Sequence, residues 1–343
     1  MDDDTGLGRS DDSPAECLLF GAFADDACAR GKRVVAIPRA SLAPLLFGGA
    51  LPPSSPSPSC FPRPPFAVAA SSCSVDGFAL AAAADGGLWQ RGAAWSRVEV
   101  AGLPQDERYA SVAVGDSVCL ALSAADGSVF QWRRRRRGEE DDEEGGDDDD
   151  GGATCVLGPR LAGDDSPLQQ HRLPVTAIAA GRRHQLAVSR AAAFAWGDTS
   201  RGQCAVAPGA SGHGAAGSSV PRPRAIEALG GVACALCAAG DAHSLLGSAD
   251  GAAVYAFGGA AHGGRAAVPA LVPESDLPAD GAPVVALAAG GKHSVALRAD
   301  GRVHGWGDAS WGQAAFGDGG GGVRSVIAGW RHTVLVLHQS AAR

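Results

Sequence analysis

Residues 284–313 read VVALAAGGKHSVALRADGRVHGWGDASWGQ, and three short apolar runs within them are separated by glycine. The first run leads into Gly290–Gly291, the second covers 293–297 and the third covers 303–306. Asp300–Gly301 lies between the last two runs, and an Asp-Gly pair supplies the positive φ angles of a tight hairpin. The stretch therefore predicts successive antiparallel strands and not a helix.

The same order of residues recurs through the chain. Further copies cover 175–203, 232–259 and 323–337, and weaker copies lie near 66–92 and 112–132. Equivalent glycines are separated by 66, 59, 50 and 39 residues at Gly115, Gly181, Gly240, Gly290 and Gly329. A repeat of roughly 50 residues with about four short strands is typical of a β-propeller blade. The sequence thus predicts an all-β chain with a single β-propeller of six recognisable repeats, and a seventh blade stays open.

The repeated pattern, AGxxHSxAL followed by DGxVxxWGxxxxGQ, resembles the regulator of chromosome condensation (RCC) repeat. The resemblance covers most of the chain outside 133–172 and the N-terminal dozen residues. We predict structural roles for the recurring glycine, histidine and tryptophan positions, which are Gly181, His184, Trp196, Gly240, His243, Gly290, His293, Trp306, Gly329 and His332.

The two ends of the chain hold complementary parts of one repeat. Residues 17–23, CLLFGAF, match the VHGWGxx part that the last copy, 323–337, lacks. We therefore expect the N-terminal strand to pair with the C-terminal strands in one blade, which closes the ring and removes exposed sheet edges. The propeller is predicted to cover 15–343, after a disordered acidic tail at 1–14.

Two segments interrupt the pattern. Residues 133–150 hold five arginines and the run EEDDEEGGDDDD, with almost no apolar side chain, so we predict a disordered insertion over 133–172. Residues 204–224 are rich in Gly, Ala, Ser and Pro and predict a flexible loop. Candidate partner-binding residues are the cationic and acidic ends of the insertion, Arg133, Arg134, Arg135, Arg136, Arg137, Asp147, Asp148, Asp149 and Asp150. The arginines suit nuclear import or nucleic acid, the acidic run suits a basic partner such as a histone tail, and a self-screened solvated linker is the alternative.

Most of the formal charge of −8 comes from that insertion. Without 133–150, 24 basic and 27 acidic side chains remain, a net charge of −3, which disfavours strong direct DNA binding. The nine cysteines are an odd number and the first residues are acidic, so we expect a nuclear or cytoplasmic protein and not a secreted one. No apolar run approaches the roughly 18–20 residues of a membrane span, so no membrane partner is expected.

The sequence offers no catalytic constellation. The four repeat histidines occupy one place in four copies, whereas a catalytic group is needed once, so we predict that each forms a structural hydrogen bond within its blade. Cys234 and Cys237 have zinc-ligand spacing, but residues three apart on a strand point to opposite faces, so no metal site is predicted. GxxxxGK[ST] and GxSxG motifs are lacking. We expect no enzyme and no cofactor, with guanine nucleotide exchange left open.

In layout the chain resembles the RCC domain-containing protein type. That resemblance implies a monomeric, non-enzymatic adaptor or scaffold with a protein partner, for which a histone lysine demethylase is one candidate, and a link to chromatin and chromosome segregation. The founding member of the family implies an alternative, a guanine nucleotide exchange factor for a Ran-like small GTPase. A third alternative comes from Trp330 in GWRHT, a string similar to one repeated in the plant UV-B photoreceptor of this family but present here once.

Overall fold

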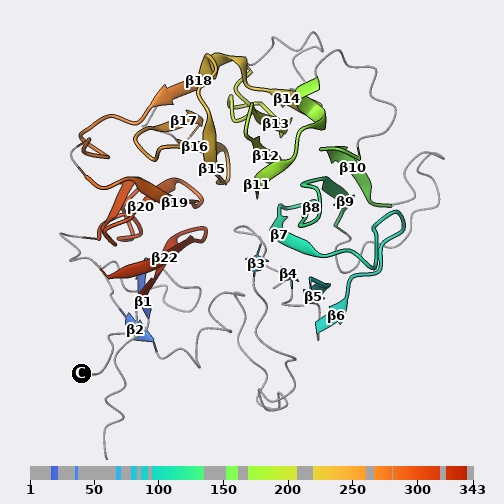
Figure 1. Ribbon diagram of the computed structural model, residues 1–343. Helices are drawn as coiled ribbons and strands as arrows, with labels where there is room; N and C mark the ends of the chain where they lie inside the picture. Colours follow the sequence, from blue (N-terminus) through green and yellow to red (C-terminus); the bar gives the residue numbers. More distant parts are fainter. Residues whose placement is uncertain are drawn as a thin grey trace, which may run out of the picture.

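The computed structural model describes twelve stretches of the chain: 17–21, 35–37, 67–70, 79–82, 86–91, 95–134, 152–160, 169–206, 219–259, 266–279, 281–316 and 322–337. These residues form six antiparallel sheets that follow one another as blades around a ring (Figure 1). Apart from the strands they contain two short 3-10 helices, Gln169–Arg172 and Glu227–Leu229. The predicted all-β propeller of six repeats is confirmed.

The blades are numbered here along the chain. The first contains β3 (Ala67–Ala70), β4 (Ala79–Ala82), β5 (Leu88–Arg91) and β6 (Trp95–Arg97). The second contains β7 (Tyr109–Val114), β8 (Val118–Ser123), β9 (Val129–Arg133) and β10 (Thr154–Leu157). The third contains β11 (Val175–Ala180), β12 (His184–Ser189), β13 (Ala193–Asp198) and β14 (Ser219–Ala225). The fourth contains β15 (Cys234–Ala239), β16 (His243–Ser248), β17 (Val254–Gly258) and β18 (Ala266–Leu271).

The last two blades depart from this plan. Among the described residues the fifth has three strands, β19 (Val284–Ala289), β20 (His293–Arg298) and β21 (Val303–Gly307). The sixth joins both ends of the chain in the order β2 (Val35–Ile37), β1 (Cys17–Gly21), β23 (His332–Leu337) and β22 (Val323–Ala328). In it Gly21 lies opposite His332, as Gly307 lies opposite His293. The predicted pairing of the N-terminal strand with the C-terminal strands is thereby confirmed.

Hydrophobic clusters fill the space between neighbouring blades. Leu186, Phe194 and Trp196 of the third blade belong to a cluster that also includes Leu120 of the second and Phe257 of the fourth. Further clusters join the first and second blades, the fourth and fifth, and the fifth and sixth. Each of these blades covers an apolar face of the next one, so the ring is held mainly by side chains packed between sheets.

The inner strand of five blades contains the same β-bulge near its start. The pairing register shifts at Tyr109/Ser111, Val175/Ala177, Cys234/Leu236, Val284/Ala286 and Val323/Ser325. The residue skipped each time is exposed: Ala110, Thr176, Ala235, Val285 and Arg324. A bulge of this kind leaves one residue unpaired and restarts the alternation of faces beyond it.

The bulge decides where two cysteines point. Cys234 lies opposite Ser248 and Cys237 opposite Leu246. Ser248 and Leu246 are two residues apart on β16, so both cysteines lie on the same face of the sheet. The prediction that they point to opposite faces is wrong, because the bulge adds one residue between them. Burial raises the pKa of both free thiols, to about 12 for Cys237, which makes them poor nucleophiles and metal ligands.

Ordered elements lie inside both predicted insertions. Within 133–172, Thr154–Leu157 forms β10 and pairs with β9, and the helix Gln169–Arg172 follows. Within 204–224, Cys204 and Val206 are buried and most of β14 is formed. These parts belong to blades, which corrects the predicted boundaries. The rest of both segments, 135–151, 161–168 and 207–218, lies outside the described residues, as does 1–14.

Candidate functional site: the face of the glycine and histidine loops

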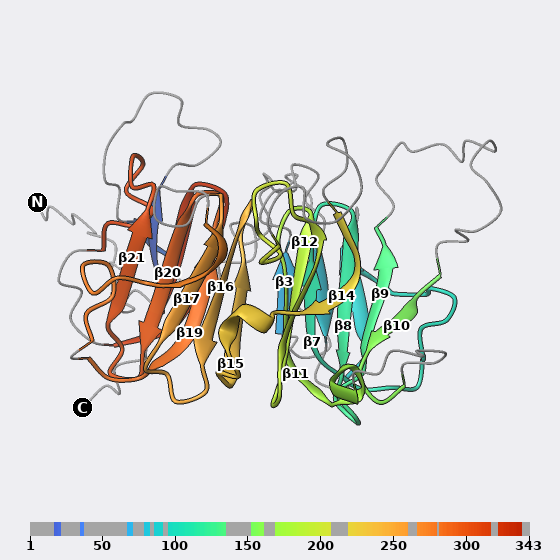
Figure 2. The same cartoon turned by 90° about the horizontal axis from the view of Figure 1, so that it is seen from above.

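In the third to sixth blades the repeat motif Gly-x-x-His forms the loop between the inner strand and the strand beside it, and Gly115 to Val118 forms the equivalent loop of the second blade. In the second to sixth blades these loops all lie on one face of the ring, because equivalent strands run in the same direction from face to face (Figure 2). We call this surface the rim face. Neighbouring loops are joined by backbone hydrogen bonds, from Asp116 N to Arg182 O (2.8 Å), Arg182 N to Gly240 O (3.1 Å), Asp241 N to Gly290 O (3.2 Å) and Gly291 N to Trp330 O (3.1 Å).

The motif glycines allow this close approach. A Cβ on Gly181 would lie 2.3 Å from Gly240 O, and one on Gly240 would lie 2.4 Å from Gly290 O. The same Cβ on Gly240 would lie 2.4 Å from Cε1 of His243. Since both the next blade and the histidine ring occupy that space, any larger residue pushes two blades apart.

We expect Gly240→Ala to lower the free energy of unfolding by about 2 kcal/mol or more, since the added methyl meets backbone of the next blade. Chemical denaturation of the purified chain measures this. Gly247→Ala is the matched control, because the added methyl would meet only side-chain atoms of Leu236, at 3.1 Å or more, and it should cost less than about 1 kcal/mol. Equal losses for the two variants would contradict this role of Gly240.

Each buried motif histidine bonds a hydroxyl of the next blade. Nε2 lies 2.9 Å from Ser244 Oγ for His184, 3.1 Å from Ser294 Oγ for His243 and 2.9 Å from Thr333 Oγ1 for His293. The predicted hydrogen bond exists, but it joins neighbouring blades and does not stay within one blade. The sequence prediction did not find this partner, because each hydroxyl follows the histidine of the next repeat.

The glutamine that closes the repeat completes the same contact. Ser244 donates its hydroxyl proton to Gln203 O at 2.7 Å, and Thr333 donates to Gln313 O at 2.7 Å. A hydroxyl has one proton, so each of these oxygens accepts from the histidine, whose Nε2 must carry its hydrogen. The glutamine amides in turn accept from backbone N–H groups of their own loops, at Arg201 and Trp311. Histidine and glutamine of one blade thus hold the hydroxyl of the next.

We expect His293→Ala to lower the free energy of unfolding by roughly 1–3 kcal/mol, because it leaves the buried Thr333 hydroxyl without its donor. Denaturation of His293→Ala, Thr333→Val and the double variant forms a cycle that isolates the bond. The double variant should cost less than the sum of the single ones. Strict additivity would show that the two side chains do not interact.

Burial keeps these histidines neutral. Burial first, and the neighbouring histidines second, lower the pKa of His184 to about 3 and that of His293 to about 4. Burial also lowers the pKa of His332. A general acid or base is most effective with a pKa near the working pH, so these groups suit structure and not proton transfer.

The residues that follow the motif glycines lie in successive loops of the rim face. In ring order these residues are Asp116, Arg182, Asp241, Gly291 and Trp330. The Arg182 guanidinium lies 3.9 Å from Asp116 and 3.5 Å from Asp241, and its Cζ lies 6.0 Å from the centre of the Trp330 ring. Arg182 belongs to the third blade and Trp330 to the sixth, so this cation–π contact spans loops that are not neighbours in the ring.

Further cations surround this centre. Arg183, Arg201 and Lys292 are exposed, and among the described residues none of them has a carboxylate within ion-pair distance. Arg331 lies over the Trp311 ring at 5.5 Å. Two nearby carboxylates form hydrogen bonds within their own loops. Asp198 accepts from Ser200 N, and Asp308 accepts from Ser310 N and Oγ. An open cleft between these groups is lined by Arg182, Arg183, Arg201, Lys292, Asp198, Asp241, Asp276 and Asp308.

Comparison with known proteins agrees with this geometry. The family model for the Regulator of chromosome condensation (RCC1) repeat matches residues 284–313. The structure is similar to human WBSCR16, with a TM-score of 0.51 and 16% identity over 94% of this chain and 98% of that one. It is equally similar to yeast RCC1 (Prp20) in its crystal structure with Kap60, with a TM-score of 0.51 and 15% identity over 95% and 89%. The chain is a β-propeller that carries a repeat of the RCC1 type at 284–313.

Two curated proteins share sequence with this propeller. The Ultraviolet-B receptor UVR8 of Arabidopsis thaliana is 29% identical over 196 residues, which are 51% of this chain and 42% of the receptor. The Probable E3 ubiquitin-protein ligase HERC6 of Homo sapiens is 33% identical over 149 residues, 42% of this chain and 14% of the ligase. The chain thus spans less than half the length of these relatives.

The structure places the predicted site residues in different settings. The repeat positions lie in the rim loops or, for Trp196 and Trp306, in the packing between blades. Arg133 ends β9 and is exposed, whereas Arg134 is 3% exposed and its N–H donates to Ser117 O, so the side chain of Arg134 is buried in the fold. The other candidates, 135–137 and 147–150, lie outside the described residues.

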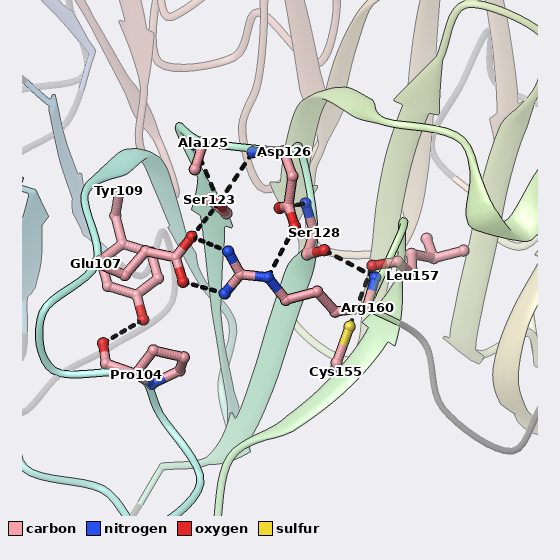
Figure 3. A network of polar contacts seen from close by, with 10 residues as sticks. All are labelled: Pro104, Glu107, Tyr109, Ser123, Ala125, Asp126, Ser128, Cys155, Leu157 and Arg160. Atoms are coloured by element: carbon pink, nitrogen blue, oxygen red, sulfur yellow. Dashed lines mark hydrogen bonds and ion pairs between the residues drawn. The ribbon is translucent and has the colours of Figure 1, made fainter.

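A polar network on the opposite face was not predicted. The Arg160 guanidinium forms ion pairs with Glu107 and, at 2.7 Å, with Asp126, and Ser123 donates to the same Glu107 carboxylate (Figure 3). The Glu107 side chain is almost fully buried. The network joins the residues after β10 to the β8–β9 hairpin and to the segment before β7. Its residues lie far apart in sequence and match no motif, which leaves no signal for sequence reasoning.

Neither a metal centre nor a membrane span is found in the part of the chain that the structure describes. No group of three or more His, Cys, Asp or Glu side chains there could hold a metal ion. No described helix is long and apolar enough to cross a bilayer.

Proposed function

We propose that this RCC-repeat propeller is a non-enzymatic protein-interaction scaffold that binds its partner through the rim face. The observation that carries the proposal is the two cation–π pairs on this face, exposed Trp330 with Arg182 and half-buried Trp311 with Arg331. Tryptophan and arginine are the side chains most enriched among residues that dominate binding energy.

The rim face is preorganised for such a contact. Its loops are tied to one another by backbone hydrogen bonds, so little conformational entropy is lost when a partner docks. Exposed ion pairs such as Arg182 with Asp116 contribute only about 0–1 kcal/mol to folding, so a partner can exchange them at small cost. Arg183, Arg201 and Lys292 have no such pairs among the described residues and favour a partner segment that carries carboxylates.

The resemblance in layout to RCC domain-containing proteins supports a chromatin-associated partner. A histone lysine demethylase is the candidate that this resemblance implies, and a role in chromatin regulation or chromosome segregation in the nucleus follows from it. Histone tails are a second class of candidate partner, because the acidic run of the insertion suits a basic segment.

Guanine nucleotide exchange on a Ran-like small GTPase is the alternative. A partner surface that displaces nucleotide needs no acid, base or nucleophile, and His184, His293 and Cys237 have pKa values unsuited to those roles. The observed tryptophans do not favour a photoreceptor. Trp196 and Trp306 are packed in different hydrophobic clusters between different blades, and they do not gather at one site.

One binding and release assay separates these functions. The purified chain is titrated against a histone lysine demethylase, histone tail peptides and a Ran-like GTPase loaded with a fluorescent nucleotide. We expect saturable binding to the demethylase and an unchanged rate of nucleotide release. Accelerated release would identify an exchange factor, and failure to bind any chromatin protein of the panel would overturn the proposed partner class.

A further inference from the structure

The fifth blade ends on an open backbone edge. Its sheet has the order β19-β20-β21, whereas each of the other five sheets has four strands among the described residues. In the third and fourth blades the fourth strand pairs antiparallel with the third, as β14 with β13 and β18 with β17. In Figure 2, β21 lies on the outside of the ring with no labelled strand beyond it in its blade. The place of a fourth strand beside β21 is therefore open in the described structure.

The backbone groups on this edge can be identified from the ladder. Asp308 N donates to Lys292 O and Arg298 N donates to Arg302 O, each at 2.9 Å. In an antiparallel pair the residues alternate between bonding the neighbour and facing away from it. Val303, Gly305 and Gly307 therefore turn their N–H and C=O groups away from β20.

Equivalent groups are occupied in the other blades. Ala193 O accepts from Ile226 N at 2.9 Å in the third blade, and Val254 O accepts from Val272 N at 2.8 Å in the fourth. Val303 holds the same position in the fifth blade, and no described residue donates to its carbonyl.

Exposure and chain length agree with an open edge. Gly307 is exposed, whereas the equivalent Gly258 is buried and Gly197 is half-buried. The connections to the next blade cover 199–233 after β13 and 259–283 after β17, but only 308–322 after β21. The shorter connection leaves fewer residues with which the chain could supply its own fourth strand.

We propose that the β21 edge binds an extended segment of a partner protein, which adds to the sheet as an antiparallel fourth strand. An unpaired edge offers a row of donors and acceptors that only an extended backbone matches in full. The site runs along the outside of the ring, and it does not rest on binding at the rim face.

The chain's own fourth strands indicate the chemistry of that segment. Val220 lies opposite Gly197 and Ala266 lies opposite Gly258, so a small aliphatic residue faces the glycine each time. The register then shifts, and this part of both strands contains proline, in SVPRPRA of β14 and AAVPAL of β18. The partner segment should accordingly place a small aliphatic residue against Gly307 and carry a proline shortly after it.

The test uses the full chain and a synthetic peptide of the sequence AAVPALV, which is residues 266–272. Amide hydrogen exchange is followed by NMR. In the free chain, the amides of Gly305 and Gly307 should exchange at least 100-fold faster than those of Ala195 and Gly197. The peptide should slow the first pair by at least tenfold. A peptide methylated on the nitrogen that corresponds to Val272 should bind at least tenfold more weakly, because it cannot donate to Val303 O.

Four results would overturn the proposal. Slow exchange of Gly305 and Gly307 in the free chain would show that the chain itself covers the edge. Absence of peptide protection, or equal binding of the methylated peptide, would exclude strand addition. Protection that rises with the concentration of the chain alone, together with a dimer in size-exclusion chromatography, would assign the edge to a second copy.

Discussion

Deletion of residues 1–24 should lower the melting temperature by roughly 10 °C or more. The deletion removes β1, which pairs with β23 along five residues from Cys17 opposite Val336 to Gly21 opposite His332. β2 pairs with β1 and loses its only strand neighbour in the described sheet. The sixth blade would keep only β22 and β23, and a two-stranded hairpin is marginally stable at best. The loss should be visible by calorimetry or circular dichroism.

Deletion of residues 1–12 is the matched control. It leaves β1 intact and should change the melting temperature by no more than about 2 °C. Equal, small effects of the two deletions would mean that the ring does not depend on pairing between the two ends of the chain.

Acidification should destabilise the folded chain at pH values well above those at which carboxylates titrate. His184 and His293 have pKa values of about 3 and about 4 in the folded chain and about 6.5 when unfolded. Below pH 6.5 the unfolded chain therefore binds protons that the folded chain does not. Stability is fully present above that pH and falls by up to about 1.4 kcal/mol per pH unit for each histidine. The two residues should together cost about 4 kcal/mol between pH 6.5 and 4.5, measured by denaturation at each pH.

His293→Gln separates this effect from general acid denaturation. The variant should be less stable at pH 7.5, because the glutamine cannot reproduce the ring contact with Gly290 and Thr333. It should nevertheless lose about 2 kcal/mol less than the natural chain between pH 6.5 and 4.5, since one titrating group is gone. An unchanged pH slope would show that His293 does not keep its low pKa in the fold.

The repeat itself could be predicted from sequence, and so could the closing blade. Short apolar runs with Asp-Gly hairpins show the strands, and Gly301 indeed has a φ of 81°. The incomplete last copy showed that residues 17–23 belong beside 323–337, because strand pairing requires a partner for each edge. β10 and β14 were not predicted, because neither has the sequence pattern of a typical strand. TCVL is only four residues long, and SVPRPRA carries two prolines that an outer strand tolerates and an inner strand does not.

The contacts of the rim face could not be predicted, although its residues could be named. The histidine motif is visible, but its hydroxyl partner lies 60 residues away for His184 and 40 for His293, in the next repeat. Arg182 meets Trp330 only because a closed ring brings the third and sixth blades to one centre. The sequence also gives no sign of the bulge in β15. Simple alternation of faces along a strand therefore predicted the wrong faces for Cys234 and Cys237.

Binding through the rim face is tested most directly by the affinity of the demethylase, or of the tightest chromatin partner in the panel, for charge-reversed variants. Arg183→Glu with Lys292→Glu changes two exposed rim cations, and Arg222→Glu with Arg224→Glu makes the same change on β14 at the outside of the third blade. Isothermal titration calorimetry at fixed salt should show at least a tenfold weaker Kd for the rim variant and less than a twofold change for the β14 variant. Equal losses for both, or an unchanged affinity of the rim variant, would contradict the rim face as the binding surface.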